Sequence, residues 1–216
     1  MQRPAVAATP EPPGDWSRAV AHLAAADPKL APLIERHGPP TIAPTTDLVP
    51  SLARAIVGQQ LSGAAARTIW GRFLALYPGG QFPRAAAVVA TADADLRAAG
   101  LSAAKAAAIK DLAGHVASAS LVPARLAAAT DDEVAAMLLP VRGIGPWSVD
   151  MFLMFALCRP DVLPVGDLGV RRAAQEVYAL PGMPTPNELF EIGEPWRPHR
   201  SLASLYLWRS LDNEPA

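Results

Sequence analysis

Apolar residues recur along most of the chain at intervals of three or four positions, the spacing of one face of an α-helix. Ile69, Phe73 and Leu76 form one such stripe, and Val170 and Val177 belong to another. No segment shows the period-two alternation that is typical of a half-buried β-strand. The pattern therefore predicts an all-α protein of roughly nine to eleven helices.

Capping signals indicate where several of these helices begin. Thr130 and Thr185 each precede a glutamate by three positions, the spacing of a capping box. Asp47 is expected to cap a helix with Pro50 in its first turn, and Pro28 to split the first helix. The expected helices cover residues 15–36, 47–58, 62–76, 93–99, 146–158 and 202–211, with others beginning at Ser102, Thr130, Asp167 and Thr185.

The most informative stretch is residues 139–157, which reads Leu-Pro-Val-Arg-Gly-Ile-Gly-Pro-Trp before a long apolar run. Gly143 and Gly145 allow a sharp turn and a close approach to the backbone, and Pro146 suits the first turn of a helix. The N-terminus of that helix presents unpaired N–H groups and a positive dipole, which suit a phosphate. A bare Gly-x-Gly would indicate an ordinary helix–helix turn, but the full context favours phosphate binding.

Composition limits the chemistry that the chain can perform. Its 216 residues include one cysteine and four scattered histidines, which exclude an internal disulfide and four-cysteine zinc or iron–sulfur sites. We therefore expect no cofactor and no catalytic metal. Cys158 is expected to be a plain buried thiol.

The N-terminal segment and the net charge of the chain give weaker indications of its location and partners. No apolar run approaches a membrane span, and residues 1–14 resemble a flexible extension rather than a signal peptide, so we expect a cytoplasmic protein. The net charge of −1 argues mildly against a nucleic-acid partner. Several arginines nevertheless lie towards the end of the chain, among them Arg142, Arg171, Arg172, Arg197, Arg200 and Arg209.

Taken together, these motifs resemble a known family. Residues 139–157 resemble the hairpin of the helix-hairpin-helix (HhH-GPD) DNA glycosylase superfamily, and residues 162–172 its Gly/Pro-rich loop with an aspartate. Residues 55–62 and 194–208 are similar to the 3-methyladenine DNA glycosylase II branch. The resemblance implies a two-lobed helical domain over residues 15–216, a hairpin lobe at about 50–165 and an active-site cleft between the lobes. We do not expect the N-terminal sheet domain of longer members, because residues 1–45 are expected to be helix and loop.

Asp167 occupies the position of the family's loop aspartate. Taken alone, it is a good helix N-cap, and the two roles are compatible. Breaking an N-glycosidic bond builds positive charge on the sugar, which a carboxylate stabilises most in the transition state. The resemblance implies this catalytic role for Asp167, which is also expected to orient or deprotonate the attacking water.

Position 147 separates two subclasses of the superfamily. Members that also cut the DNA strand carry a nucleophilic lysine there, whereas this chain has Trp147, whose indole cannot form a Schiff base. We therefore expect a monofunctional glycosylase without lyase activity. Lys105 and Lys110 are the nearest alternatives, and their spacing favours solvated positions on a helix surface.

The resemblance also implies an aromatic pocket for the flipped base. Trp147 and Trp196 match the family's pocket tryptophans. Met151 and Leu168 stand where a branch member has tyrosines, which indicates a less aromatic, roomier pocket. Trp147 and Met151 are also compatible with plain core packing, and for Trp208 the core is the preferred interpretation.

Two residues are candidate wedges that fill the hole left by the flipped nucleotide. Gln60 corresponds to the plug position of relatives, and Leu101 resembles a second wedge on the opposite strand. The alternatives are that Gln59 and Gln60 cap a helix end and that Leu101 is buried.

The remaining implied contacts belong to the DNA backbone and to a cation. In relatives a monovalent cation, Na⁺ or K⁺, is held with DNA by hairpin carbonyls, which would here belong to Leu139, Val141 and Ile144. The residues expected to contact the DNA backbone are Arg142, Gly143, Ile144, Gly145, Ser102 and Lys105.

The sequence thus predicts a monomeric, nucleoid-associated repair enzyme that acts on double-stranded DNA containing alkylated bases, chiefly 3-methyladenine and 7-methylguanine. Other damaged bases, namely hypoxanthine, ethenoadenine and 1-methyladenine, remain as alternative substrates. Two further classes also remain open: a non-catalytic helix-hairpin-helix module that only binds DNA, and a helical protein-interaction domain. Salt-dependent DNA affinity separates the last of these from the others.

Overall fold

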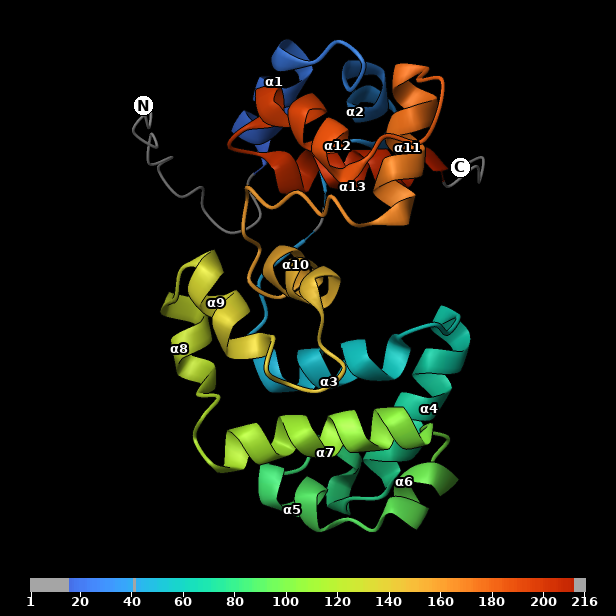
Figure 1. The fold of residues 1–216 in the computed structure, drawn as a ribbon, viewed down its shortest axis with the longest axis vertical. Helices are drawn as coiled ribbons and strands as arrows, with labels where there is room; N and C mark the ends of the chain where they lie inside the picture. Colours follow the sequence, from blue (N-terminus) through green and yellow to red (C-terminus); the bar gives the residue numbers. More distant parts are fainter. Residues whose placement is uncertain (1–15, 41, 212–216) are drawn as a thin grey trace. The chain divides into compact units, whose positions relative to one another are not determined.

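The computed structural model describes residues 16–40 and 42–211, and within them every regular element is a helix (Figure 1). The predicted all-α class is confirmed. These residues form thirteen α-helices and two 3₁₀ helices, more than expected, because six-residue helices are too short to show a stripe. They are α1 (Ser17–Ala26), α2 (Ala31–His37), α3 (Leu48–Gly58), α4 (Gly63–Ala75), η1 (Pro78–Gly80), α5 (Ala85–Ala90), α6 (Asp93–Ala98), α7 (Ala103–Ala117), α8 (Pro123–Ala128), α9 (Asp131–Leu138), α10 (Pro146–Phe155), α11 (Leu168–Tyr178), α12 (Pro186–Ile192), η2 (Glu194–Trp196) and α13 (Arg200–Leu211).

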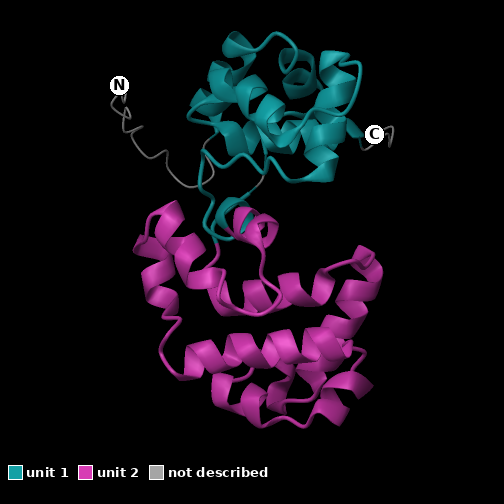
Figure 2. Cartoon of the chain, viewed as in Figure 1, with its two compact units in different colours: residues 1–44, 153–216 teal, residues 45–152 magenta. Residues whose placement is uncertain are grey.

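The chain divides into two compact units (Figure 2). Unit 1 comprises residues 1–44 and 153–216, and unit 2 comprises residues 45–152. The hairpin lobe expected at 50–165 is therefore shorter at its end, because the chain after Phe152 packs with unit 1. The expected flexible extension, residues 1–14, lies outside the described residues.

The core of unit 1 joins the two ends of the described chain. Helices α1 and α2 pack with α11 and α13, and the largest fully buried side chains there are Trp196 and Tyr206. The Tyr206 hydroxyl donates to the Gly38 carbonyl at 3.0 Å. The buried Asp27 carboxylate accepts hydrogen bonds from Tyr178 and, at 2.7 Å, from the Trp196 indole. A buried carboxylate is destabilising unless it accepts hydrogen bonds. The bonds to Asp27 therefore favour the packing of the N-terminal segment against the later segments that carry Tyr178 and Trp196.

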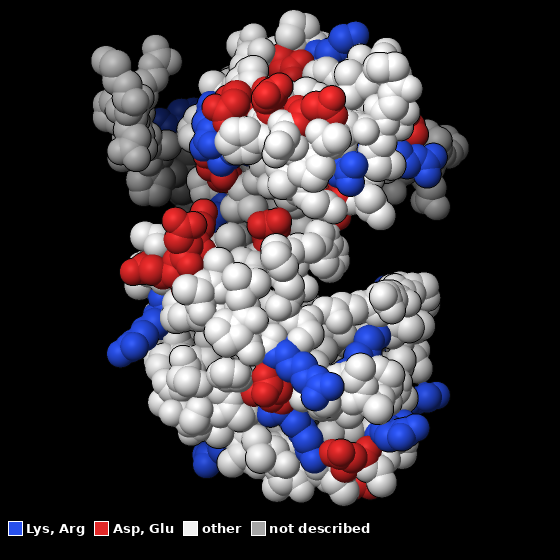
Figure 3. Space-filling model, in the orientation of Figure 1, with Lys and Arg blue, Asp and Glu red and all other residues white. Residues whose placement is uncertain are grey.

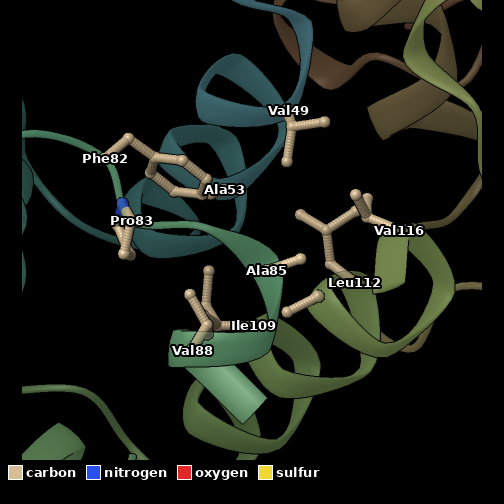
Figure 4. Close-up of a pocket in the computed structure, with 10 residues that line it drawn as sticks. Val49, Ala53, Phe82, Pro83, Ala85, Val88, Ile109, Leu112 and Val116 are labelled. Atoms are coloured by element: carbon tan, nitrogen blue, oxygen red, sulfur yellow. The ribbon is translucent and has the colours of Figure 1, made fainter. Parts of the chain in front are cut away.

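Unit 2 is built around α7, which packs on α3, α5 and α6 (Figure 1). An apolar cavity of about 170 Å³ lies among α3, α5 and α7 (Figure 4). Its lining carries no charged side chain and so offers nothing to orient a polar substrate. The lining residues are Val49, Ala53, Phe82, Pro83, Ala85, Val88, Ile109, Leu112, Ala113 and Val116.

Most of the predicted helix ends are confirmed, including both capping boxes at Thr130 and Thr185. The prediction for Asp47 is wrong, because its side chain makes no capping hydrogen bond and its own N–H donates to Thr45. Helix α10 ends at Phe155 rather than at Cys158, which has a φ of +51° that an α-helix excludes. No helix of the described residues combines the length and the apolar character that a membrane crossing needs.

Candidate active site and DNA-binding hairpin

Asp167 caps helix α11 as predicted. Its Oδ1 accepts a hydrogen bond from the Val170 N–H at 2.8 Å, and its backbone is extended, as an N-cap requires. The residue is buried, with 9% of its surface exposed. A helix N-terminus stabilises a carboxylate through its dipole and its N–H groups, so the local structure both holds and favours this anion.

A second donor reaches the same oxygen from helix α13. The Trp208 indole N–H donates to Asp167 Oδ1 at 2.8 Å, and the indole stacks on Phe155 with ring centroids 5.9 Å apart. Trp208 packs against the core of unit 1, as preferred, and its indole N–H also reaches Asp167, which that interpretation did not include. A buried indole N–H needs a partner, but nothing in the local sequence indicated that this partner is Asp167.

Space around this pair is tight on the side of Gly169. A Cβ atom at Gly169 would lie 3.0 Å from Asp167 Oδ1 and 3.0 Å from Trp208 Nε1. Such distances are shorter than ordinary van der Waals contact. Glycine at this position therefore lets the indole and the carboxylate meet above the first turn of α11.

The loop that precedes Asp167 is anchored to α13. The Ser201 hydroxyl donates to the Arg159 carbonyl at 2.6 Å and accepts from the Val162 N–H at 2.9 Å. The Asp167 N–H donates to the Pro164 carbonyl at 2.9 Å. These bonds hold the backbone on which the carboxylate sits, so its direction is set by the fold of unit 1.

The predicted hairpin joins α9 to α10, and Gly143 makes its turn. Gly143 has a φ of +80°, and a Cβ atom there would lie 3.1 Å from the Cβ of Ala108 in α7. The Arg142 N–H donates to the Asp111 carboxylate of the same helix at 2.7 Å. Both the left-handed backbone and the close packing on α7 therefore require glycine at position 143.

Gly145 has a different environment. A Cβ atom at Gly145 would meet nothing within 4 Å, and the residue directly precedes α10. Its carbonyl accepts the first hydrogen bond of that helix, from Val149 at 3.1 Å. The neighbouring Val141 and Ile144 side chains are buried, which leaves backbone groups to form the outer surface of the turn. The expected cation contacts of Leu139, Val141 and Ile144 remain a prediction.

The predicted pocket residues differ in exposure. Trp147, in unit 2, is 46% exposed, and Leu168, in unit 1, is 65% exposed, while Met151 of unit 2 is half-buried. Exposed aromatic and aliphatic side chains of this size are suited to contact a base. The prediction for Trp196 is wrong: its side chain is 0% exposed and its indole is bound by Asp27 within the core of unit 1.

The two wedge candidates also differ in exposure. Gln60 is exposed and has a φ of +56°, which projects it from the turn between α3 and α4. Leu101 is only 3% exposed, so the wedge prediction for it is wrong and the buried alternative holds. The Gln59 side chain points elsewhere and donates to the Gly143 carbonyl of the hairpin at 2.9 Å.

Lys105 does not present a free ammonium group for a phosphate. Its Nζ donates to the carbonyls of Val57 and Gln59 at 2.7 and 2.6 Å, and burial lowers the pKa of the ammonium. The Lys105 ammonium thus supports the end of α3, and its expected contact with the DNA backbone remains a prediction. The Ser102 hydroxyl caps α7 by accepting from the Lys105 N–H, and its expected DNA contact remains a prediction.

Two of the late arginines are held in ion pairs. Arg197 and Arg200 both bind the Asp161 carboxylate, at 2.7 and 2.6 Å, and Arg197 also pairs with Glu194. On the face drawn in Figure 3, basic side chains lie interspersed with acidic ones on both units. On the face drawn, no broad basic surface is seen.

Comparison with known proteins decides the family. Residues 53–198 match the sequence profile of the HhH-GPD superfamily base excision DNA repair proteins. The chain belongs to this superfamily. DNA-3-methyladenine glycosylase 1 of Schizosaccharomyces pombe is 32% identical to this chain, in an alignment that covers 90% of this chain and 87% of the yeast protein. The alkylbase DNA glycosidase-like protein mag2 of the same yeast is 28% identical, and that alignment covers 90% of this chain and 93% of mag2.

Solved structures agree with this assignment to the HhH-GPD superfamily. The S. pombe glycosylase Mag1 in complex with abasic DNA superposes with a TM-score of 0.83 at 30% identity, covering 91% of this chain and 97% of that one. A DNA-3-methyladenine glycosidase from Bacillus halodurans gives a TM-score of 0.81 at 35% identity, covering 91% and 90%. The resemblance predicted from the sequence motifs is confirmed.

Proposed function

We propose that the chain is a DNA glycosylase of base excision repair that removes alkylated purines from double-stranded DNA as a monomer. The observation that carries the proposal is the Asp167 carboxylate, held by the Val170 N–H and the Trp208 indole. The relatives named as 3-methyladenine glycosylases support the class of substrate. The leading substrates are 3-methyladenine and 7-methylguanine.

The chemistry follows from the charge that develops on the sugar. When the N-glycosidic bond breaks, its electron pair leaves with the base, and the deoxyribose becomes cationic. The Asp167 carboxylate stabilises this cation more than the neutral ground state. Water then bonds to the anomeric carbon and passes its proton to the Asp167 carboxylate. An alkylated purine is already cationic and departs as a neutral base, so less acid catalysis is needed.

The hairpin supplies the grip on the DNA strand. We assign phosphate binding to the N-terminus of α10 and the turn before it, where Gly145 leaves the backbone open. We also propose that the carbonyls of Leu139, Val141 and Ile144 would hold a Na⁺ or K⁺ ion when DNA is bound. The exposed Arg142 side chain adds a positive charge next to the same turn.

Base recognition is assigned to exposed apolar side chains. Trp147 provides an electron-rich ring that attracts a cationic purine, and Met151 and Leu168 supply adaptable apolar contacts. Gln60 is assigned as the plug that replaces the extruded nucleotide in the stack. Because position 147 is tryptophan rather than lysine, we propose that the enzyme leaves the abasic strand uncut.

The direct test uses duplexes that each carry one defined alkylated base. Wild-type protein is expected to release the base without strand cleavage until alkali is added. Asp167→Asn keeps the size of the side chain and should lower base release by at least about a hundredfold while preserving DNA binding. Full activity of Asp167→Asn would defeat the assignment of the carboxylate, and base-independent binding alone would indicate a non-catalytic module.

A further inference from the structure

The turn that carries Gln60 is held by contacts from two other parts of unit 2. It follows α3, spans residues 58–61 and is closed by a hydrogen bond from the Leu61 N–H to the Gly58 carbonyl at 3.2 Å. Gln60 itself takes the left-handed conformation, with a φ of +56°, and its side chain is exposed. A non-glycine residue keeps this conformation only where the surroundings impose it.

One of these contacts comes from helix α7. The Lys105 ammonium donates to the Val57 carbonyl at 2.7 Å and to the Gln59 carbonyl at 2.6 Å, one on each side of Gly58. The last carbonyls of a helix lack partners within the helix and carry its negative dipole end. A single ammonium thus holds the end of α3 and the residue directly before Gln60.

The other contact comes from the hairpin. The Gln59 side chain donates to the Gly143 carbonyl at 2.9 Å, and its amide lies 3.5 Å from the Ser148 hydroxyl in α10. Gly143 is itself fixed by its positive φ and by its contact with Ala108 of α7. The hairpin turn, the end of α3 and α7 are therefore cross-linked through two polar side chains.

We propose that Lys105 and Gln59 are positioning residues that keep the Gln60 plug in register with the DNA-gripping hairpin. The inference rests on the proposed function. An inserted plug must resist the tendency of the duplex to restack, which is worth a few kcal/mol. A flexible turn would let the restacking duplex push Gln60 out. A turn that is hydrogen-bonded to the hairpin is held in place by the DNA strand that the hairpin binds, so strand binding by the hairpin stabilises the inserted Gln60.

The test compares base release from duplex and from single-stranded DNA that carry the same lesion. A plug matters only where a partner strand can restack, so Lys105→Met should lower release from the duplex by roughly tenfold and from the single strand by less than about twofold. Lys110→Met is the matched control, because Lys110 lies on the same helix and pairs with Asp93 at the surface. It should change neither rate.

Gln59→Met provides an independent variant, since it removes the amide that reaches the hairpin while keeping the length of the side chain. It should show the same difference between duplex and single strand. Lys105→Arg retains donors for both carbonyls and should restore most of the duplex activity. In a Gln60→Ala background, Lys105→Met should have little further effect, because residues that act through one another are not additive.

A second readout does not depend on catalysis. The fluorescence of 2-aminopurine placed opposite an abasic-site analogue should increase when wild-type protein inserts Gln60. With Lys105→Met at saturating protein, the increase should be smaller. Equal loss of activity on duplex and single strand, or additive effects with Gln60→Ala, would overturn the inference. If wild-type protein releases no alkylated base, the proposed function fails, and the fluorescence difference still decides whether Lys105 and Gln59 position the plug.

Discussion

At the scale of single residues, the candidate active site is organised around one carboxylate oxygen of Asp167. Asp167 Oδ1 accepts hydrogen bonds from the Val170 N–H and from the Trp208 indole, both at 2.8 Å. The first bond belongs to the helix cap, an interaction common to helices that begin with aspartate. The second is specific to this site, because it fixes the rotation of the carboxylate about its side-chain axis.

Trp208→Phe removes the indole donor while keeping a ring to stack on Phe155. Because a hydrogen bond to a charged group is worth about 1.5–3 kcal/mol, we expect kcat for base release to fall roughly tenfold or more. Single-turnover assays on a lesion duplex measure this. Trp70→Phe, an indole change within unit 2, is the control and should leave kcat unchanged. A normal rate for Trp208→Phe would show that the helix cap alone orients the carboxylate.

At the scale of elements, the hairpin uses its two glycines for different purposes. Gly143 is required by the protein itself, since its backbone is left-handed and α7 lies against it. A Cβ atom at Gly145 would meet nothing within 4 Å, so packing inside the protein does not require glycine there, and the proposed phosphate contact would. Glycine is therefore needed for folding at position 143 and is proposed to serve DNA binding at position 145.

The pair Gly143→Ala and Gly145→Ala separates these roles. Gly143→Ala should lower the free energy of unfolding by about 1–2 kcal/mol, because alanine resists a positive φ. Gly145→Ala should leave stability within about 0.5 kcal/mol of wild type yet weaken DNA binding several-fold. Denaturant titration and fluorescence anisotropy with labelled duplex measure the two quantities. Unchanged DNA affinity in Gly145→Ala would remove the hairpin backbone from the interface.

At the scale of the whole molecule, the net charge is −1, and on the face drawn in Figure 3 basic and acidic side chains are mixed. Stability also responds to pH through Asp150 of α10. Burial raises the pKa of this carboxyl from its ordinary value near 3.8 to about 6. Between these values the folded chain holds a proton that the unfolded chain releases, so this group's contribution to stability falls as pH rises through that window.

Asp150→Asn is therefore expected to raise Tm at pH 7.5, where the wild-type carboxylate is charged and partly desolvated. The difference should shrink towards pH 4, where the folded wild-type group is protonated. Thermal unfolding of both proteins at the two pH values measures this. Glu191→Gln removes a carboxylate from an exposed position and should give no such pH-dependent difference. An equal Tm difference at both pH values would contradict the effect of burial.

The sequence by itself determined those features that depend on neighbours a few positions apart. The stripes of Ile69 and Phe73, the capping boxes and the cap at Asp167 arise from interactions over three or four residues, which a pattern records. The Gly-Ile-Gly turn and the family resemblance were also sufficient to place the candidate carboxylate and hairpin. Asp47 shows the limit even here, since a favourable cap residue made no cap.

Only the tertiary structure decided which polar side chains are engaged. Trp208 lies 41 positions from Asp167, Trp196 lies 169 positions from Asp27, and Lys105 lies 46 positions from Gln59. Each pairing changed how a residue is interpreted: Trp208 also contacts the candidate carboxylate, Trp196 belongs to the core rather than to the pocket, and Lys105 supports the end of α3. The physical reason is that a hydrogen bond needs two groups about 3 Å apart in the correct direction, and for distant residues that distance exists only after the chain has packed.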